Sequence, residues 1–217
     1  MKTTLLAMAC LFLLTIQGVA QMQFSIGPKF GLNMSTLTVD PDPYQGETTI
    51  PKGGRMNIMF AAQVQMMFAR MFGVKIEPGY TTKSARWEDN QGGKRTISVS
   101  EIQIPILFLV SFLQGTVEPY AFVGPNLGIV ASASDKTETQ GGTQDVDIKS
   151  NVSGLDFAMD FGGGTKFKIT NQVAITGDIR YSLGLSNLDA RQIPAGATAP
   201  STKSRGFQIQ FGALFSL

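Results

Sequence analysis

Charged side chains recur at alternating positions within otherwise apolar or small-residue segments of this 217-residue chain. Lys75 and Glu77 are two residues apart, and so are Asp178 and Arg180. Residues two apart lie on the same face of a β-strand, so each pair would present opposite charges side by side. Such groups could form ion pairs, relay protons or line a path for small solutes. Which of these they do depends on the elements that position them.

Several kinds of chemistry are excluded by residue type. Histidine is absent, and the one cysteine, Cys10, lies in an apolar N-terminal run. Imidazole bases, disulfides and Cys/His metal sites are therefore ruled out, and acyl transfer lacks its usual base. The glycine run Gly162–Lys166 lacks the spacing of a phosphate-binding loop. We expect no catalytic residue, no metal site and no cofactor.

The first 20 residues have the composition of a secretory signal peptide. Lys2 precedes an apolar run over residues 5–16, and small residues before Gln21 offer a cleavage site. The run is shorter than the roughly 20 residues that span a bilayer. We expect residues 1–20 to be removed and residues 21–217 to form one domain. Removing Lys2 from 18 basic and 16 acidic residues leaves 17 against 16, a balance that argues against nucleic acid as a partner.

Apolar and polar residues alternate along eight segments of the remaining chain. In the last segment Phe207, Ile209 and Phe211 share one side, while Gln208 and Gln210 share the other. A period of two predicts a β-strand whose two faces meet different environments. The predicted strands cover about residues 23–33, 57–69, 72–82, 96–112, 117–131, 153–168, 173–186 and 204–217.

The predicted connections alternate in length. Tight turns follow the second, fourth and sixth strands, at residues 70–71, 113–116 and 169–172. Long polar connections follow the first, third, fifth and seventh, at residues 34–56, 83–95, 132–152 and 187–203. This pattern is typical of outer-membrane barrels with short periplasmic turns and long extracellular loops. It predicts an all-β, eight-stranded antiparallel up-and-down transmembrane β-barrel in a Gram-negative outer membrane, with both termini periplasmic.

The apolar side of each segment carries no charge, which favours a lipid-facing surface. A lipid-facing Lys or Arg costs about 2–4 kcal/mol at the bilayer midplane. A soluble, lipocalin-like barrel is the alternative, with its apolar face turned inward around a ligand. Its outer face should then be rich in charge, whereas the polar faces here hold mainly Gly, Ala, Ser and Gln. The membrane barrel is therefore the preferred interpretation.

If the apolar faces meet lipid, the charged side chains fill the barrel. An eight-stranded barrel is just wide enough for its side chains to fill it, and buried charges must be paired. We expect a polar plug that holds the barrel shut; a proton or small-solute path is the alternative. The expected interior residues are five basic and six acidic: Lys29, Lys75, Glu77, Glu101, Glu118, Asp156, Asp160, Lys166, Lys168, Asp178 and Arg180.

Prolines conflict with this strand assignment at several positions. A closed barrel should pair every backbone N–H within the membrane, and proline has none. The sequence gives no account of Pro105. The prolines inside or beside predicted strands are Pro28, Pro78, Pro105, Pro119 and Pro125.

Four stretches resemble the small porin-family, PorT-like outer-membrane β-barrel proteins of Bacteroidota. They are residues 27–33 (GPKFGLN), 101–107 (EIQIPIL), 119–128 (PYAFVGPNLG) and 178–185 (DIRYSLGL). The resemblance implies an outer-membrane barrel and little else, because members of this group mostly lack an assigned activity. The chain ends in Leu217, whereas barrel-assembly signals usually end in an aromatic residue.

These observations together favour a non-enzymatic envelope protein. We expect outer-membrane lipid and the barrel-assembly machinery as partners, and action through extracellular loops or as a structural component of the envelope. The extracellular ligand or envelope partner is left open by the sequence. A narrow porin or solute conduit is the first alternative, and an outer-membrane hydrolase or acyltransferase is the second.

Overall fold

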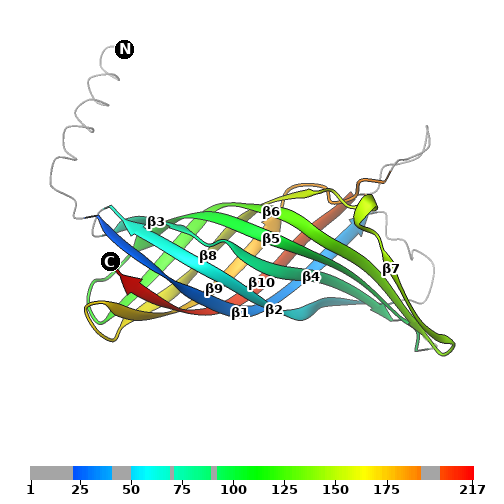
Figure 1. Cartoon of the computed structure of the whole chain (residues 1–217), viewed down its shortest axis with the longest axis horizontal. Helices are drawn as coiled ribbons and strands as arrows, with labels where there is room; N and C mark the ends of the chain where they lie inside the picture. Colours follow the sequence, from blue (N-terminus) through cyan, green and yellow to red (C-terminus); the bar gives the residue numbers. More distant parts are fainter. Residues whose placement is uncertain (1–21, 41–49, 69–70, 89–91, 192–200) are drawn as a thin grey trace, which may run out of the picture.

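The computed structural model describes residues 22–40, 50–68, 71–88, 92–191 and 201–217, so the expected signal peptide lies outside the described residues. The described residues form one sheet of ten antiparallel strands (Figure 1). No helix among the described residues is long and apolar enough to cross a membrane. The elements are β1 (Gln23–Asp40), β2 (Ile50–Met67), β3 (Phe72–Ile76), β4 (Gly79–Glu88), β5 (Lys94–Ser111), β6 (Val117–Thr139), β7 (Gly142–Asp147), the 3₁₀ helix η2 (Lys149–Asn151), β8 (Leu155–Lys168), β9 (Val173–Gly184) and β10 (Ser201–Ser216).

The sheet closes on itself because β1 pairs with both β2 and β10. β3 and β4 together fill one position between β2 and β5, and β7 has β6 as its only partner strand among the described residues. The ring therefore has eight positions, which confirms the predicted eight-stranded antiparallel barrel. The Leu217 N–H donates to the Phe24 carbonyl at 2.9 Å, so the first and last strands meet at one end. We call this the terminus end, and the opposite end, which carries β7, the hairpin end.

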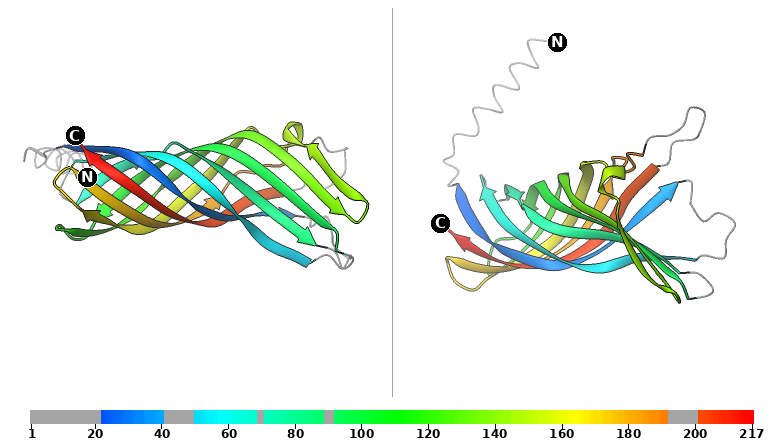
Figure 2. Two further views of the ribbon diagram at one scale, coloured as in Figure 1. Left: turned by 60° about the horizontal axis from the view of Figure 1, so that its bottom comes forward. Right: turned by 45° about the vertical axis from the view of Figure 1, so that its right-hand side comes forward.

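The strands at the hairpin end are longer than predicted. β1 continues to Asp40, β4 reaches Glu88 and β6 runs on to Thr139 before returning as β7, although the sequence predicted long connections there. The outward face of these extensions is mainly polar, and apolar residues such as Leu37, Ala85 and Trp87 face inward instead. The charge-free apolar outer face that marked the predicted strands is therefore absent here. The backbone pairing of the extensions persists, and the sheet projects beyond the closed ring (Figure 2).

The predicted third strand is broken at Glu77 and Pro78, between β3 and β4. β5 pairs with β3 on one side of the break and with β4 on the other, and Pro105 lies at this level. The Glu77 N–H donates to the Pro105 carbonyl at 3.2 Å. Pro105 pairs in register with Asn126, so Pro125 lies beside it. The three prolines thus gather where strand pairing is already interrupted, which accounts for Pro105.

The two faces of the barrel differ sharply in exposure. Phe30, Ile58 and Ile179 point outward and are 57%, 62% and 60% exposed, whereas Lys29 and Arg180, adjacent in sequence to two of them, are 2% and 1% exposed. Side chains on a strand alternate between faces, so this contrast is the physical consequence of the period of two. The outer surface is an apolar band, and the charged residues lie inside.

Candidate functional site

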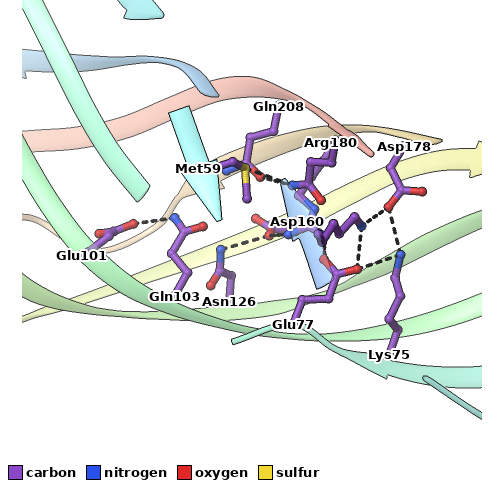
Figure 3. Close-up of polar contacts among 12 residues, drawn as sticks. Met59, Lys75, Glu77, Glu101, Gln103, Asn126, Asp160, Asp178, Arg180 and Gln208 are labelled. Carbon is purple, nitrogen blue, oxygen red and sulfur yellow. Dashed lines mark hydrogen bonds and ion pairs between the residues drawn. The ribbon is translucent and has the colours of Figure 1, made fainter. Parts of the chain in front are cut away.

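The central charged cluster of the barrel is built around Glu77, at the end of β3. Its Oε1 atom lies 2.7 Å from Lys29 Nζ and 3.0 Å from Lys75 Nζ, and its Oε2 atom pairs with Arg180. Each of these four side chains is at most 1% exposed. Three cations from β1, β3 and β9 therefore converge on one buried carboxylate. Figure 3 shows Glu77 with Lys75 and Asp178 beside it.

Two further carboxylates balance those three cations. Asp178 on β9 pairs with Lys29, lies 3.1 Å from Lys75 Nζ and accepts a hydrogen bond from the Tyr120 hydroxyl. Asp160 on β8 lies 3.4 Å from Arg180 and accepts a hydrogen bond from Asn126 at 3.0 Å. The cluster thus holds three positive and three negative groups. Burial of charge is tolerable only when it is paired in this way.

Aromatic rings line the terminus side of the central cluster. Phe122 on β6 lies beneath two cations, with Lys75 Nζ 4.6 Å and the Arg180 guanidinium carbon 5.4 Å from its ring centroid. The negative face of an aromatic ring attracts a desolvated cation. Phe122 therefore supplies favourable electrostatic contact as well as apolar packing.

A second charged cluster lies nearer the hairpin end. Lys83 Nζ is 2.5 Å from Glu101 Oε1 and 2.7 Å from Asp156 Oδ2. Gln103 donates to Glu101 at 2.5 Å, and the Ser186 hydroxyl donates to Asp156 at 2.5 Å. All three charged side chains are nearly inaccessible to solvent.

Lys83 was missed by the sequence reasoning, which ended the third strand at Thr82 and assigned Lys83 to a connection. The available signal was the alternation itself, since Lys75, Glu77 and Lys83 all occupy odd-numbered positions. The proline break does not shift that alternation, because Thr81 and Lys83 are buried and face inward. Added to the predicted interior residues, Lys83 would make six basic and six acidic, but one of the predicted residues, Lys168, lies outside the buried interior.

The third charged group lies at the terminus end. Glu118 pairs with Lys166 and lies 2.5 Å from Lys168 Nζ. The Lys168 side chain is 46% exposed, so it belongs to the mouth of the barrel and not to its buried interior. The pair with the half-exposed Lys168 contributes less to stability than the pairs of the two buried clusters.

Apolar layers separate the charged clusters from both ends, although the sequence predicted a mainly small and polar interior. One layer, toward the terminus end, consists of Met67, Leu107, Leu109, Tyr120 and Phe122. The other, at the hairpin end, consists of Leu37, Ala85, Trp87, Val99, Val130, Ala133 and Leu188. An ion crossing the lumen would have to leave water at each layer, which is energetically costly.

Some buried polar atoms of the described residues have no hydrogen-bond partner. They include Glu101 Oε2, Asn126 Oδ1, Asp160 Oδ1 and Arg180 Nε, all of which lie in or between the two buried clusters. Buried polar groups of this kind are usually satisfied by internal water. Among the described residues, no three acidic, cysteine or histidine side chains gather in a way that could hold a metal ion.

Comparison with known proteins assigns this chain to a family. A family model described as "Outer membrane protein beta-barrel domain" matches residues 19–190. The curated protein sequences contain no significant match. The structure of OprG from Pseudomonas aeruginosa gives a TM-score of 0.57 at 14% identity, over 93% of this chain and 98% of that chain.

Two other solved barrels are less similar. Neisserial surface protein A gives a TM-score of 0.48 at 10% identity, over 89% of this chain and 96% of that chain. The outer membrane protease OmpT from Escherichia coli gives a TM-score of 0.45 at 8% identity, over 90% of this chain and 96% of that chain. At such identities the likeness concerns the fold alone. The family model, in contrast, covers most of the sequence, and the chain belongs to the outer membrane protein beta-barrel domain family, whose barrels lie in outer-membrane lipid.

Proposed function

We propose that this protein is a closed, non-enzymatic outer-membrane barrel that acts through its extracellular loops or as a structural component of the envelope. The observation that carries the proposal is the central cluster, in which Lys29, Lys75 and Arg180 are matched by Glu77, Asp178 and Asp160 at the barrel centre. Paired charges that fill a narrow lumen leave no continuous aqueous path. The apolar layers on either side of the charged clusters support the same conclusion.

The surroundings of the buried acidic side chains that the structure describes support a non-enzymatic role. The chain has no histidine, and the buried carboxylates are each engaged by a cation or a hydrogen-bond donor. A general base must be free to accept a proton from a substrate within hydrogen-bond reach. Lipid-hydrolysis and acyl-transfer assays on the purified protein test this: we expect no turnover, and any turnover above that of an inert barrel would contradict the proposal.

We further propose that the terminus end faces the periplasm and the hairpin end faces the exterior. In this orientation residues 1–20 are a signal peptide, the mature chain begins at Gln21, and the barrel-assembly machinery inserts it. The projecting β6–β7 hairpin supports a role for the exterior loops, because all six residues of β7 are exposed. The short turn between β8 and β9 lies at the opposite end, as expected for a periplasmic turn.

Membership of the PorT-like group from Bacteroidota is also proposed. Its support is the sequence resemblance over residues 119–128 and 178–185, which lie in β6 and β9. Both stretches contribute to the central cluster, through Tyr120 and Asn126 on β6 and through Asp178 and Arg180 on β9. An envelope protein of this group would be recovered with outer membranes and would show heat-modifiable migration.

A narrow solute conduit is the second candidate function. The unpartnered polar atoms between the buried clusters favour it, because they could bind a short chain of water. At the terminus end, a cavity of about 520 Å³ lined by residues including Gln65, Lys166 and Lys168 opens toward solvent. Liposome swelling separates the two functions. A closed barrel leaves the swelling rate in small sugars and amino acids at that of protein-free vesicles, whereas a conduit raises it.

A further inference from the structure

The residues that follow β9 fold inward over the hairpin end of the lumen. Leu188 is 1% exposed, and it packs with Leu37, Trp87 and Val99, which project from the inner faces of the strands. Among the residues that the structure describes, Leu188 is the one fully buried member of this apolar layer that does not come from a barrel strand. A loop residue thus completes a layer that the strands leave incomplete.

Backbone hydrogen bonds hold this segment in place. The Leu188 N–H donates to the Thr202 carbonyl at 2.8 Å, and the Ser153 N–H donates to the Leu188 carbonyl at 2.8 Å. Val152 and Asp189 form an isolated antiparallel bridge, which joins the segment to the connection that contains η2. Leu188 is therefore fixed from both sides, by the start of β10 and by the start of β8.

An ion pair shapes the outer side of the same segment. Arg191 lies 2.5 Å from Asp189, and its backbone N–H also donates to that carboxylate. Burial alone would raise the pKa of the Asp189 carboxyl. The hydrogen bonds from Arg191 lower it by more than burial raises it, so this pKa lies below its usual range. The segment thus buries Leu188 and the Asp189 side chain and leaves Arg191 half-exposed to solvent.

The second charged cluster lies directly inside this apolar layer. Lys83 precedes Ala85 by one inward-facing position on β4, and Glu101 follows Val99 by one inward-facing position on β5. Asp156 is linked to the segment as well, since it accepts a hydrogen bond from Ser186 at 2.5 Å. Removing Leu188 would therefore open a route from solvent to a buried charged cluster.

We propose that residues 187–191 form a lid that closes the lumen at the hairpin end, and that the buried Leu188 side chain is the part of the lid that excludes water. This inference rests on the proposed closed barrel and names the part that excludes external water. Trp87 reports on the lid directly, because it is the sole tryptophan of the chain, is 5% exposed and belongs to the same apolar layer. Quenching of Trp87 fluorescence by acrylamide therefore measures access past Leu188.

The experiment compares variants of the purified, folded protein in vesicles. Leu188→Ser should raise the acrylamide quenching constant of Trp87 severalfold, and Leu188→Met, which conserves volume, should leave it unchanged. Leu185→Ser is the matched control, because Leu185 lies three residues earlier and is 54% exposed. Equal quenching in wild type and Leu188→Ser would overturn the lid.

A labelling measurement covers the case in which Leu188→Ser does not fold. Leu188→Cys should react slowly with a soluble maleimide, and Gly141→Cys, at the exposed β6–β7 turn, should react fast. Equal fast rates would overturn the lid. Conductance of the wild-type protein distinguishes this failure from failure of the proposed function: a wild-type pore contradicts the closed barrel, whereas a closed wild type with fast Leu188→Cys labelling contradicts the lid alone.

Discussion

Lys29 and Glu77 are separated by 48 residues in the sequence, yet Lys29 Nζ and Glu77 Oε1 are 2.7 Å apart inside the barrel. They come from β1 and from the end of β3, which are not neighbouring strands, because β2 lies between them. Asp178 on β9 contacts the same ammonium from the other side, past β10. These two ion pairs of Lys29 therefore join strands that share no backbone hydrogen bonds.

Glu77→Gln should fold but unfold more easily. The substitution leaves Lys29, Lys75 and Arg180 with only two carboxylates between them, and removing one partner of a buried ion pair costs about 3–5 kcal/mol. Urea unfolding in lipid vesicles, followed by Trp87 fluorescence, measures the loss. Glu138→Gln is the control, because Glu138 and its partner Lys136 are both more than 40% exposed and their pairing should contribute almost nothing to stability. Similar losses for both variants would contradict a special role for Glu77.

Lys83→Met should destabilise the barrel by a comparable amount. The change leaves Glu101 and Asp156 buried without their cation, and the expected loss is again about 3–5 kcal/mol. Lys203→Met, at an exposed position on β10, is the matched control and should be nearly neutral. A neutral result for Lys83→Met in the same unfolding assay would mean that this cluster does not need its lysine.

Much of this arrangement could be predicted from alternation alone. The inward direction of Lys75, Glu77, Asp178 and Arg180 follows from a period of two against an apolar outer face. Which cation pairs with which carboxylate could not be predicted, because the pairing depends on how far each strand is staggered around the closed sheet. Lys83 was missed for a local reason: the polar run from Thr81 to Ser84 makes the part of β4 that begins at Lys83 look like a connection.

The apolar layers inside the barrel were harder to predict. Inward-facing Leu107 and Leu109 alternate with outward-facing Ile106 and Phe108, so both faces of this part of β5 are apolar and alternation gives no contrast. Leu188 carries no periodic signal, because it lies in a connection. Its burial depends on tertiary contacts with strands that are distant in the sequence.

Phe161→Arg should prevent folding or strongly destabilise the protein. Phe161 faces outward on β8 and is 41% exposed, so arginine at this position would be presented to lipid at a cost of about 2–4 kcal/mol near the midplane. Folding yield in vesicles, judged by heat-modifiable migration, measures the effect, and Phe161→Leu is the control. Normal folding of the arginine variant would place this face outside the bilayer.

Cysteine labelling on whole cells should reveal the orientation. Gly141→Cys lies at the hairpin end and should react with a membrane-impermeant maleimide, because we assign that end to the exterior. Asn171→Cys lies in the turn between β8 and β9 and should react only after the outer membrane is permeabilised. The mature chain has no native thiol to interfere, since Cys10 lies in the expected signal peptide. Labelling with the opposite pattern would invert the proposed orientation.

Planar-bilayer recording of the wild-type protein beside Glu77→Gln tests the closed lumen most directly. If paired charges and two apolar layers fill the barrel, the wild-type protein gives no steady conductance above the bare membrane. Glu77→Gln should then give at most irregular, brief openings that reflect a loosened cluster. Large, regular wild-type steps whose ion selectivity changes in Glu77→Gln would contradict the closed barrel, because Glu77 would then line an open pore.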